Sequence, residues 1–119
     1  MITLKELISI LKESEFKFVF NQWKKDPNGE PPSPPPLPYL VYSIGYSNDL
    51  IADNQNYLHT HEVHIDLYQN DSFYDFELEK RLRHLLRDKQ VPFRMGEVIH
   101  LETERMYETT LTVTVIEKD

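Results

Sequence analysis

Residues 39–82 constrain the fold most, because two strand patterns are followed there by a helix pattern. Residues 39–46 are an apolar run typical of a buried strand, and residues 47–57 are polar and turn-like. Residues 58–69 then alternate, so that apolar side chains share one face and polar ones the other. Such a half-polar strand favours an antiparallel sheet with one wetter face.

A helix over residues 72–88 is predicted next. Asp71 or Ser72 is expected to be its N-cap, because a short polar side chain can accept a hydrogen bond from the first free backbone N–H groups. Basic residues fill the later turns, where positive charge suits the helix dipole. The buried stripe is expected to contain Leu78, Leu82, Leu85 and Leu86, with Phe76 nearby.

The segment before residue 39 contains a helix, a strand and a loop. Residues 3–13 have apolar positions at helical spacing, and Thr3 followed by Glu6 fits a capping box. Residues 16–23 are aromatic and β-branched, which predicts a strand. Residues 24–38 contain seven of the eight prolines, six of them after a turn signal, so we expect a stiff projecting loop. A ligand for a proline-recognising domain is the alternative for this loop.

Two further strands, at about residues 93–102 and 106–117, complete the chain. In the last strand, threonines alternate with larger apolar residues, which predicts one face directed to solvent or to a partner. The order is α-β-β-β-α-β-β. We therefore expect an α+β fold, with a mainly antiparallel or mixed curved sheet of about five strands and two helices on one face.

Composition sets the outer limits. The 119 residues suffice for one domain, residues 1–119, and the absence of cysteine excludes disulfides and thiolate zinc sites. The net charge of −7 argues against free double-stranded DNA as a direct ligand. The sequence has no run long and apolar enough for a membrane span and no signal-peptide pattern, so we expect no membrane partner and synthesis in the cytoplasm.

The histidines are the sharpest candidates for chemistry. His59 and His61 share one face of their strand, and at about 3.4 Å per residue they lie about 7 Å apart along it. Such a pair could bind Zn²⁺ or Ni²⁺. A third ligand is the difficulty, because His64 faces the other side. The alternative is a strand end that emerges from the core with partly hydrated imidazoles.

Catalytic patterns are weak. Asp49 with Asp53 and Glu102 with Glu104 are carboxylate pairs, but both fall in expected turns, where solvated side chains are the simpler interpretation. The sequence has three glycines and neither a Gly-rich phosphate loop nor a Gly-x-Ser-x-Gly elbow. We therefore expect no enzyme activity, no catalytic residues and no cofactor.

One ordered set of short motifs resembles a known family. It comprises residues 38–42 (PYLVY), residues 52–54 (ADN) with Tyr57, a strand that ends at residues 66–68 (DLY), and an acidic-start helix. The set resembles small proteins of the head–tail joining region of siphophages and prophages, in which the motifs are roughly PPYIVY, ADN and ELY. The likeness covers about residues 35–117.

The resemblance implies a tail terminator or tail-completion protein. Such proteins form a hexameric ring on the tail tube, in some cases from a monomer in solution, and have no cofactor. The implied partners are further copies of the chain, the major tail-tube protein and the head–tail connector, with DNA only as passing cargo. The implied locations are the host bacterial cytoplasm during assembly and the head–tail interface of the virion.

The loops are the expected contact sites in such a ring. We expect Asn28, Pro31 and Pro34 of the projecting loop to make assembly contacts, together with the loop of Ala52, Asp53 and Asn54. The chain departs from the family in its longer proline loop and its histidine cluster. A head-completion or connector adaptor, and a histidine-based metal-binding protein, are the alternatives.

Overall fold

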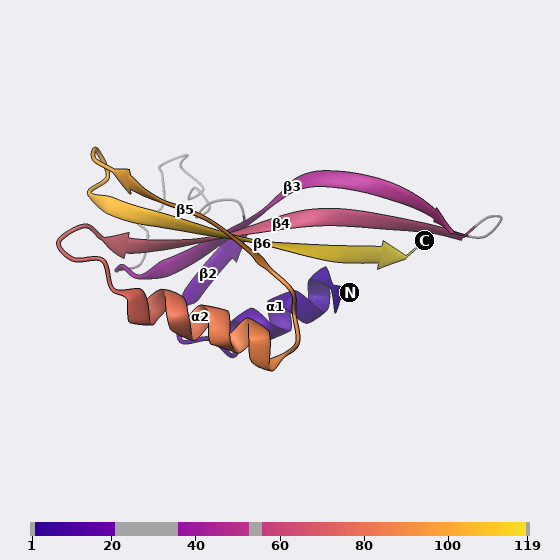
Figure 1. The fold of residues 1–119 in the computed structure, drawn as a ribbon, viewed down its shortest axis with the longest axis horizontal. Coiled ribbons are helices and arrows are strands. Elements are labelled where there is room, and N and C mark those ends of the chain that lie inside the picture. Colours follow the sequence, from indigo (N-terminus) through magenta and orange to yellow (C-terminus); the bar gives the residue numbers. More distant parts are fainter. Residues whose placement is uncertain (1, 21–35, 53–55, 119) are drawn as a thin grey trace, which may run out of the picture.

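The computed structural model of the protein describes residues 2–20, 36–52 and 56–118, which form one twisted mixed sheet and two helices (Figure 1). The predicted α+β class, with both helices on one face of the sheet, is confirmed. The described part of the sheet has six strands, against about five expected. In chain order the elements are β1 (Ile2–Thr3), α1 (Leu4–Lys12), β2 (Lys17–Phe20), β3 (Tyr39–Ala52), β4 (Asn56–Asn70), α2 (Phe76–Asp88), β5 (Arg94–Leu101) and β6 (Met106–Lys118).

β4 and β6 lie at the centre of the sheet. The strand order is β1-β6-β4-β3-β2, and β5 pairs with the same edge of β6 as β1, at the other end of that strand. The β3–β4, β4–β6 and β5–β6 pairs are antiparallel, whereas β1–β6 and β2–β3 are parallel. The additional strand is β1, which has two residues and pairs with Val115 and Ile116.

The core lies between the sheet and the two helices. As predicted, alternate residues of β4 and β6 point to opposite faces, and Val63, Ile65 and Leu67 are fully buried under the helices. Thr109, Leu111, Val113 and Val115 continue this face on β6, while Thr110, Thr112 and Thr114 share the other face. Each fully buried leucine or isoleucine contributes about 1.5–3 kcal/mol relative to an exposed one. The helices contribute Leu7, Ile10, Leu11, Leu82 and Leu86.

The predicted capping box at the start of α1 is confirmed. The Glu6 backbone N–H donates to the Thr3 hydroxyl at 3.2 Å, and the Glu6 carboxylate accepts from the Thr3 backbone N–H at 3.3 Å. Two backbone groups that would otherwise lack partners are thereby satisfied. Thr3 is also the last residue of β1, so the chain passes from sheet to helix without a loop.

α2 begins later than predicted, and both predicted caps are wrong. The N-cap is Asp75, whose carboxylate accepts a hydrogen bond from the Glu77 backbone N–H at 2.9 Å. The residues predicted as caps, Asp71 and Ser72, lie in the turn that leaves β4. There the Asn70 side chain accepts from the Ser72 backbone N–H at 2.8 Å, which favours a turn over the start of a helix.

The β3–β4 hairpin is longer than predicted. The polar loop expected at residues 47–57 is mostly strand, because β3 continues to Ala52 and β4 begins at Asn56. Cross-strand hydrogen bonds satisfy the backbone whatever the polarity of the side chains, so a polar sequence can extend a hairpin. The register shifts between Ile44 and Ser47, where the strands contain an irregularity. The turn predicted at residues 53–54 lies outside the described residues.

Candidate interaction surfaces

Most of the predicted assembly contacts lie outside the part of the chain that the structure describes. This applies to Asn28, Pro31, Pro34, Asp53 and Asn54. Ala52 is the last residue of β3 and pairs with Asn56 across the projecting hairpin. The loop assignments therefore stay predictions.

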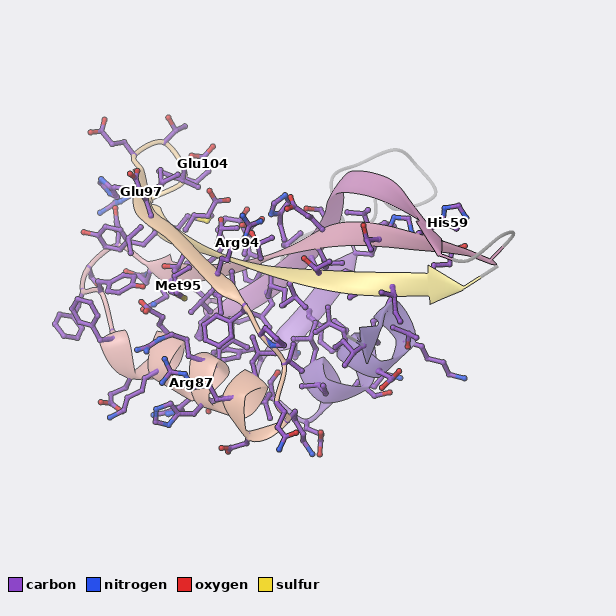
Figure 2. All side chains as sticks on the ribbon, turned by 45° about the vertical axis from the view of Figure 1, so that its right-hand side comes forward. His59, Arg87, Arg94, Met95, Glu97 and Glu104 are labelled. Carbon is purple, nitrogen blue, oxygen red and sulfur yellow. The ribbon has the colours of Figure 1, made fainter. Side chains whose placement is uncertain are left out.

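The histidine pair occupies the face that the sequence predicts. His61 shares the helix-bearing face with Val63, and one of its ring nitrogens, Nε2, lies 3.0 Å from the Glu117 carboxylate of β6. His59 lies on the same strand two residues earlier, within the projecting hairpin (Figure 2). Among residues 2–20, 36–52 and 56–118, no three His, Asp or Glu side chains converge as a metal ion requires. His61 thus forms a cross-strand pair with the carboxylate of Glu117.

His64 points to the opposite face, as predicted, and packs against the irregular part of β3. Its Nδ1 lies 3.0 Å from the Thr112 hydroxyl of β6. Its ring also covers Gly45, where an added Cβ would meet the His64 Nε2 at 2.3 Å. The absence of a side chain at residue 45 therefore leaves room for the imidazole.

A row of cross-strand polar contacts follows β4 and β6 on the helix-free face; we call it the polar ladder. Thr112 with His64 is its first member. The Thr110 hydroxyl donates to the Asp66 carboxylate at 2.5 Å, and the Tyr68 hydroxyl donates to the Glu108 carboxylate at 2.7 Å. The Tyr39 ring, from β3, lies 5.4 Å from the Tyr68 ring and is itself buried. The side chains of the polar ladder are therefore partly shielded from solvent.

Burial changes the titration of the polar ladder. Desolvation raises the pKa of Asp66 above its ordinary value, against the lowering effect of the Thr110 hydrogen bond, and the negative charge of Glu108 raises it further. Burial also raises the pKa of Tyr68, followed by its hydrogen bond to Glu108. The donors and acceptors of the ladder satisfy one another, so its geometry suits a stable surface better than substrate activation.

The carboxylates that lie close together differ from those named by the sequence. Glu102 and Glu104 are exposed in the β5–β6 turn, in keeping with solvated turn residues. The sequence analysis missed Asp66 and Glu108, which approach each other across β4 and β6. The sequence does show that each of these acidic residues lies on the polar side of an alternating strand. Only the pairing register of the two strands shows that the residues are neighbours.

Two phenylalanines form the most exposed apolar feature of the described chain. Phe73, in the loop between β4 and α2, is 75% exposed, and Phe76, at the start of α2, is 70% exposed. Phe76, which we expected near the buried stripe of α2, is therefore not itself buried. Phe76 belongs to the first turn of α2, next to the loop between β4 and α2 that projects past the end of the sheet (Figure 1). We call Phe73 and Phe76 the aromatic knob.

Tyr74 connects Phe76 of the aromatic knob to the sheet. Its ring packs edge-on against Phe76 and Tyr107, at centroid distances of 4.9 and 5.5 Å. Its hydroxyl donates to the buried Glu79 carboxylate at 2.6 Å and lies 2.7 Å from the Thr109 hydroxyl. Burial and then the hydrogen bond to Glu79 raise the pKa of Tyr74 to about 12. Phe76 is thus held in place although most of its own surface is open to solvent.

An apolar hollow lies at the start of α1; we call it the α1 hollow. It has a volume of about 400 Å³. Its walls come from α1, from Ile44 of β3 and from the end of β6. Ile44 is 39% exposed there, because α1 begins beside β1 and leaves the hairpin beyond it uncovered (Figure 1). Other lining residues are Leu4, Lys5, His61, Ile116 and Glu117.

The outer edge of β5 is a third exposed surface. Met95, Val98 and Ile99 are between 40% and 46% exposed, and β5 pairs only with β6 among the described strands. The register shifts between Met95 and Val98, and charged side chains stand at Arg94 and Glu97 (Figure 2). Bulges and charges of this kind oppose the addition of another strand.

Comparison with models of known protein families finds none that matches the chain, and comparison with curated proteins finds no relative. Within the described residues, neither helix has the length and apolar character needed to cross a membrane.

Proposed function

We propose that this chain is a structural protein of a siphophage or prophage, a tail terminator that forms a ring on the end of the tail tube and joins tail to head. The observation that carries the proposal is the placement of the exposed apolar side chains. They lie in the aromatic knob, at the α1 hollow and along the outer edge of β5, on separate parts of the surface rather than around converging reactive groups. A subunit that must contact a different surface of its neighbour needs two such places.

The motif order supports the same function. The PYLVY run lies at the start of β3, and the strand that ends in Asp66-Leu67-Tyr68 is β4, so the resembling motifs belong to the paired centre of the sheet. Asp66 and Tyr68 of that motif are members of the polar ladder. The motifs thereby support a shared fold as well as a shared role.

The partners follow from this role. The ring would be made of copies of this chain, six by the resemblance, and it would contact the major tail-tube protein on one side and the head–tail connector on the other. The net charge of −7 suits a ring through which DNA passes without binding tightly. The protein would act without a cofactor, in the host cytoplasm during assembly and then in the virion.

Deletion of the gene from its parent phage or inducible prophage, with negative-stain electron microscopy of the lysate, tests the proposal. We expect filled heads beside separate tails of abnormal or uncontrolled length, and normal particles when the gene is supplied in trans. Detached tails of normal length would favour a head-completion or connector adaptor instead. Intact, infectious particles would rule out both structural roles.

A further inference from the structure

The helix-free face of the sheet is most deeply buried at the start of β3. Tyr39 and Val41 are 6% and 9% exposed, although they pair with Tyr68 and Asp66 of β4 and therefore share the face of the polar ladder. Tyr68 and Asp66 are only half-buried, and Thr114, on the same face of β6, is exposed. Both helices lie on the other side of the sheet (Figure 1), so they do not account for this burial.

Val41 shows most plainly that this part of the face has a further cover. Its cross-strand neighbours are Asp66 on one side and Val19 of β2 on the other. Such neighbours cover the flanks of a side chain, but its tip points away from the sheet. Val19 is itself half-buried, although β2 pairs only with β3 among the described strands. We call Val19, Tyr39 and Val41 the apolar corner.

The two helical crossovers have the same hand. The chain passes from β1 to β2 through α1 and from β4 to β5 through α2, each time between parallel strands of one sheet. The second crossover reverses both the strand direction and the direction of travel across the sheet, which leaves the hand unchanged while both helices cover one face. About 98% of such connections are right-handed. Each helix therefore lies on the face that this rule requires.

The same rule directs the connection between β2 and β3 to the opposite face. These strands are parallel neighbours, and the chain returns from β2 toward the middle of the sheet, against the direction in which it crossed from β1 to β2. A connection of the same hand must then run over the helix-free face. Eighteen residues separate the two strands (39 − 20 − 1 = 18), which exceeds the dozen or so that a crossover needs.

The composition of this connection suits the surface beneath it. Residues 21–35 contain five prolines and the only tryptophan of the chain. Proline has no backbone N–H, so a proline-rich segment can lie over a sheet with few unsatisfied donors. Proline-rich segments also bind surfaces lined by aromatic rings. The rings of Tyr39 and Tyr68, 5.4 Å apart, provide such a surface beside the apolar corner.

We infer that residues 21–35 pack on the helix-free face of their own molecule, over the apolar corner and beside the polar ladder, instead of projecting from the domain. The inference follows from the strand topology and the burial at the start of β3, so it does not depend on the proposed function. It closes this part of the face to other proteins. The part of the face that stays open to a partner is the end near Thr114 of β6.

Disulfide trapping within one molecule tests on which side the segment lies, because the chain has no cysteine of its own. Ser33→Cys in the segment is combined with either Ser43→Cys or Ile44→Cys. These are consecutive residues of β3, with Ser43 on the helix-free face and Ile44 on the helix-bearing face, so the length of the tether is nearly the same. Each dilute protein is equilibrated in a glutathione redox buffer, and intact mass spectrometry after alkylation measures the internal disulfide.

We expect several-fold more internal disulfide with Ser43→Cys than with Ile44→Cys, although Ile44 is 39% exposed and readily accessible. Thermal unfolding of the reduced proteins checks that both double variants fold. Equal fractions, or an excess with Ile44→Cys, would overturn the inference. A disulfide between two molecules of the Ser33→Cys/Ser43→Cys protein, in place of the internal one, would assign the segment to a neighbouring copy and would also overturn it.

Trypsin gives a second test that needs no cysteine, because the segment contains Lys24 and Lys25. Cleavage there should be several-fold slower in the folded wild type than in a synthetic peptide of residues 17–38. Val41→Ser, which weakens the apolar corner, should speed cleavage at a temperature well below its Tm. Thr114→Ser, on the exposed part of the same face, is the matched control and should not. A wild-type rate equal to that of the peptide would show a projecting segment and would overturn the inference, whether or not Val41→Ser folds.

Discussion

The two faces of the central strands are built from alternate residues of the same segments, yet they are stabilised in different ways. On the helix-bearing face, Ile65 and Leu111 are fully buried in an apolar core. On the helix-free face, the intervening residues form the polar ladder, in which Asp66 and Thr110 are only partly buried. The core depends on the area removed from water, whereas the ladder depends on the geometry of individual hydrogen bonds.

The two faces of the sheet differ in the substitutions that they tolerate. A core position can accept another apolar residue of similar volume at small cost. A ladder position requires a donor opposite an acceptor, and loss of one partner leaves the other partly buried without a hydrogen bond. The helix-bearing face should therefore dominate stability, and the ladder should determine the register and the chemistry of the open face.

The largest expected effect is on the core. Leu111→Ala should lower the free energy of unfolding by about 2–5 kcal/mol, because it leaves a cavity at a fully buried position. Urea unfolding followed by fluorescence or circular dichroism measures this, with an unchanged m-value as the check for two-state behaviour. The matched control is Thr112→Ala. Thr112 follows Leu111 directly but lies on the opposite face, beside His64, and its replacement should lower the free energy of unfolding by about 1 kcal/mol. Equal losses in the two variants would contradict the division between the faces.

The second effect is on the ladder. Tyr68→Phe removes the 2.7 Å hydrogen bond to Glu108 and should lower the free energy of unfolding by about 1–2 kcal/mol. Tyr42→Phe is the control, because the contacts of Tyr42 are ring contacts with Phe18 and Phe20, and it should change stability by less than about 0.5 kcal/mol. Equal, small effects would mean that water replaces the Tyr68 hydroxyl at Glu108 without loss.

The third effect is a dependence on pH. The pKa of Asp66 is raised in the folded protein above the ordinary 3.8, mainly by burial, so folding favours the protonated carboxyl. This contribution is complete below the unfolded pKa and is lost as the pH rises through the folded pKa. Asp66→Asn keeps an acceptor for Thr110 and does not ionise. Its stability relative to the wild type should therefore improve as the pH rises from about 4 to about 7.

Thermal unfolding of the wild type and of the Asp66→Asn variant across this pH window gives the measurement. The difference between the two proteins matters, because the other carboxylates are common to both and their contributions largely cancel. Glu104→Gln, in the exposed β5–β6 turn, is the control and should follow the wild type at every pH. A difference that is constant with pH would show that Asp66 has the same pKa in the folded and unfolded chains.

Local patterns predicted much of the fold because the corresponding physics is local. The Thr3–Glu6 capping box and the alternation of β4 and β6 depend on residues close together in the sequence, and both are present. β1 could not be predicted in this way, since two residues form a strand only through pairing with distant residues of β6. The start of α2 was misplaced because three neighbouring residues can act as caps, and hydrogen bonds around the β4 end decide among them.

The surfaces were harder to predict than the fold. Phe76 has a residue type typical of cores, yet it lies exposed in the first turn of α2, next to the loop that leaves β4. The α1 hollow combines residues from both ends of the chain and from β3, a combination that only tertiary structure provides. The closeness of Asp66 and Glu108 likewise depends on the β4–β6 register, which side-chain alternation alone leaves open.

The smallest expected effect concerns an exposed ion pair next to the ladder. Arg94 of β5 donates to Glu62 of β4 at 2.8 Å, but its side chain is 69% exposed, so water screens the pair. Arg94→Ala should therefore change the free energy of unfolding by less than about 0.5 kcal/mol, with any difference reduced in high salt.

Urea unfolding of Arg94→Ala, Tyr68→Phe and the double variant measures both the single effect and its coupling to the ladder. If Arg94→Ala costs as much as Tyr68→Phe and the two effects are not additive, the polar face behaves as one cooperative network. Independent, unequal effects would instead mean that each hydrogen bond stabilises its own position, in proportion to its burial.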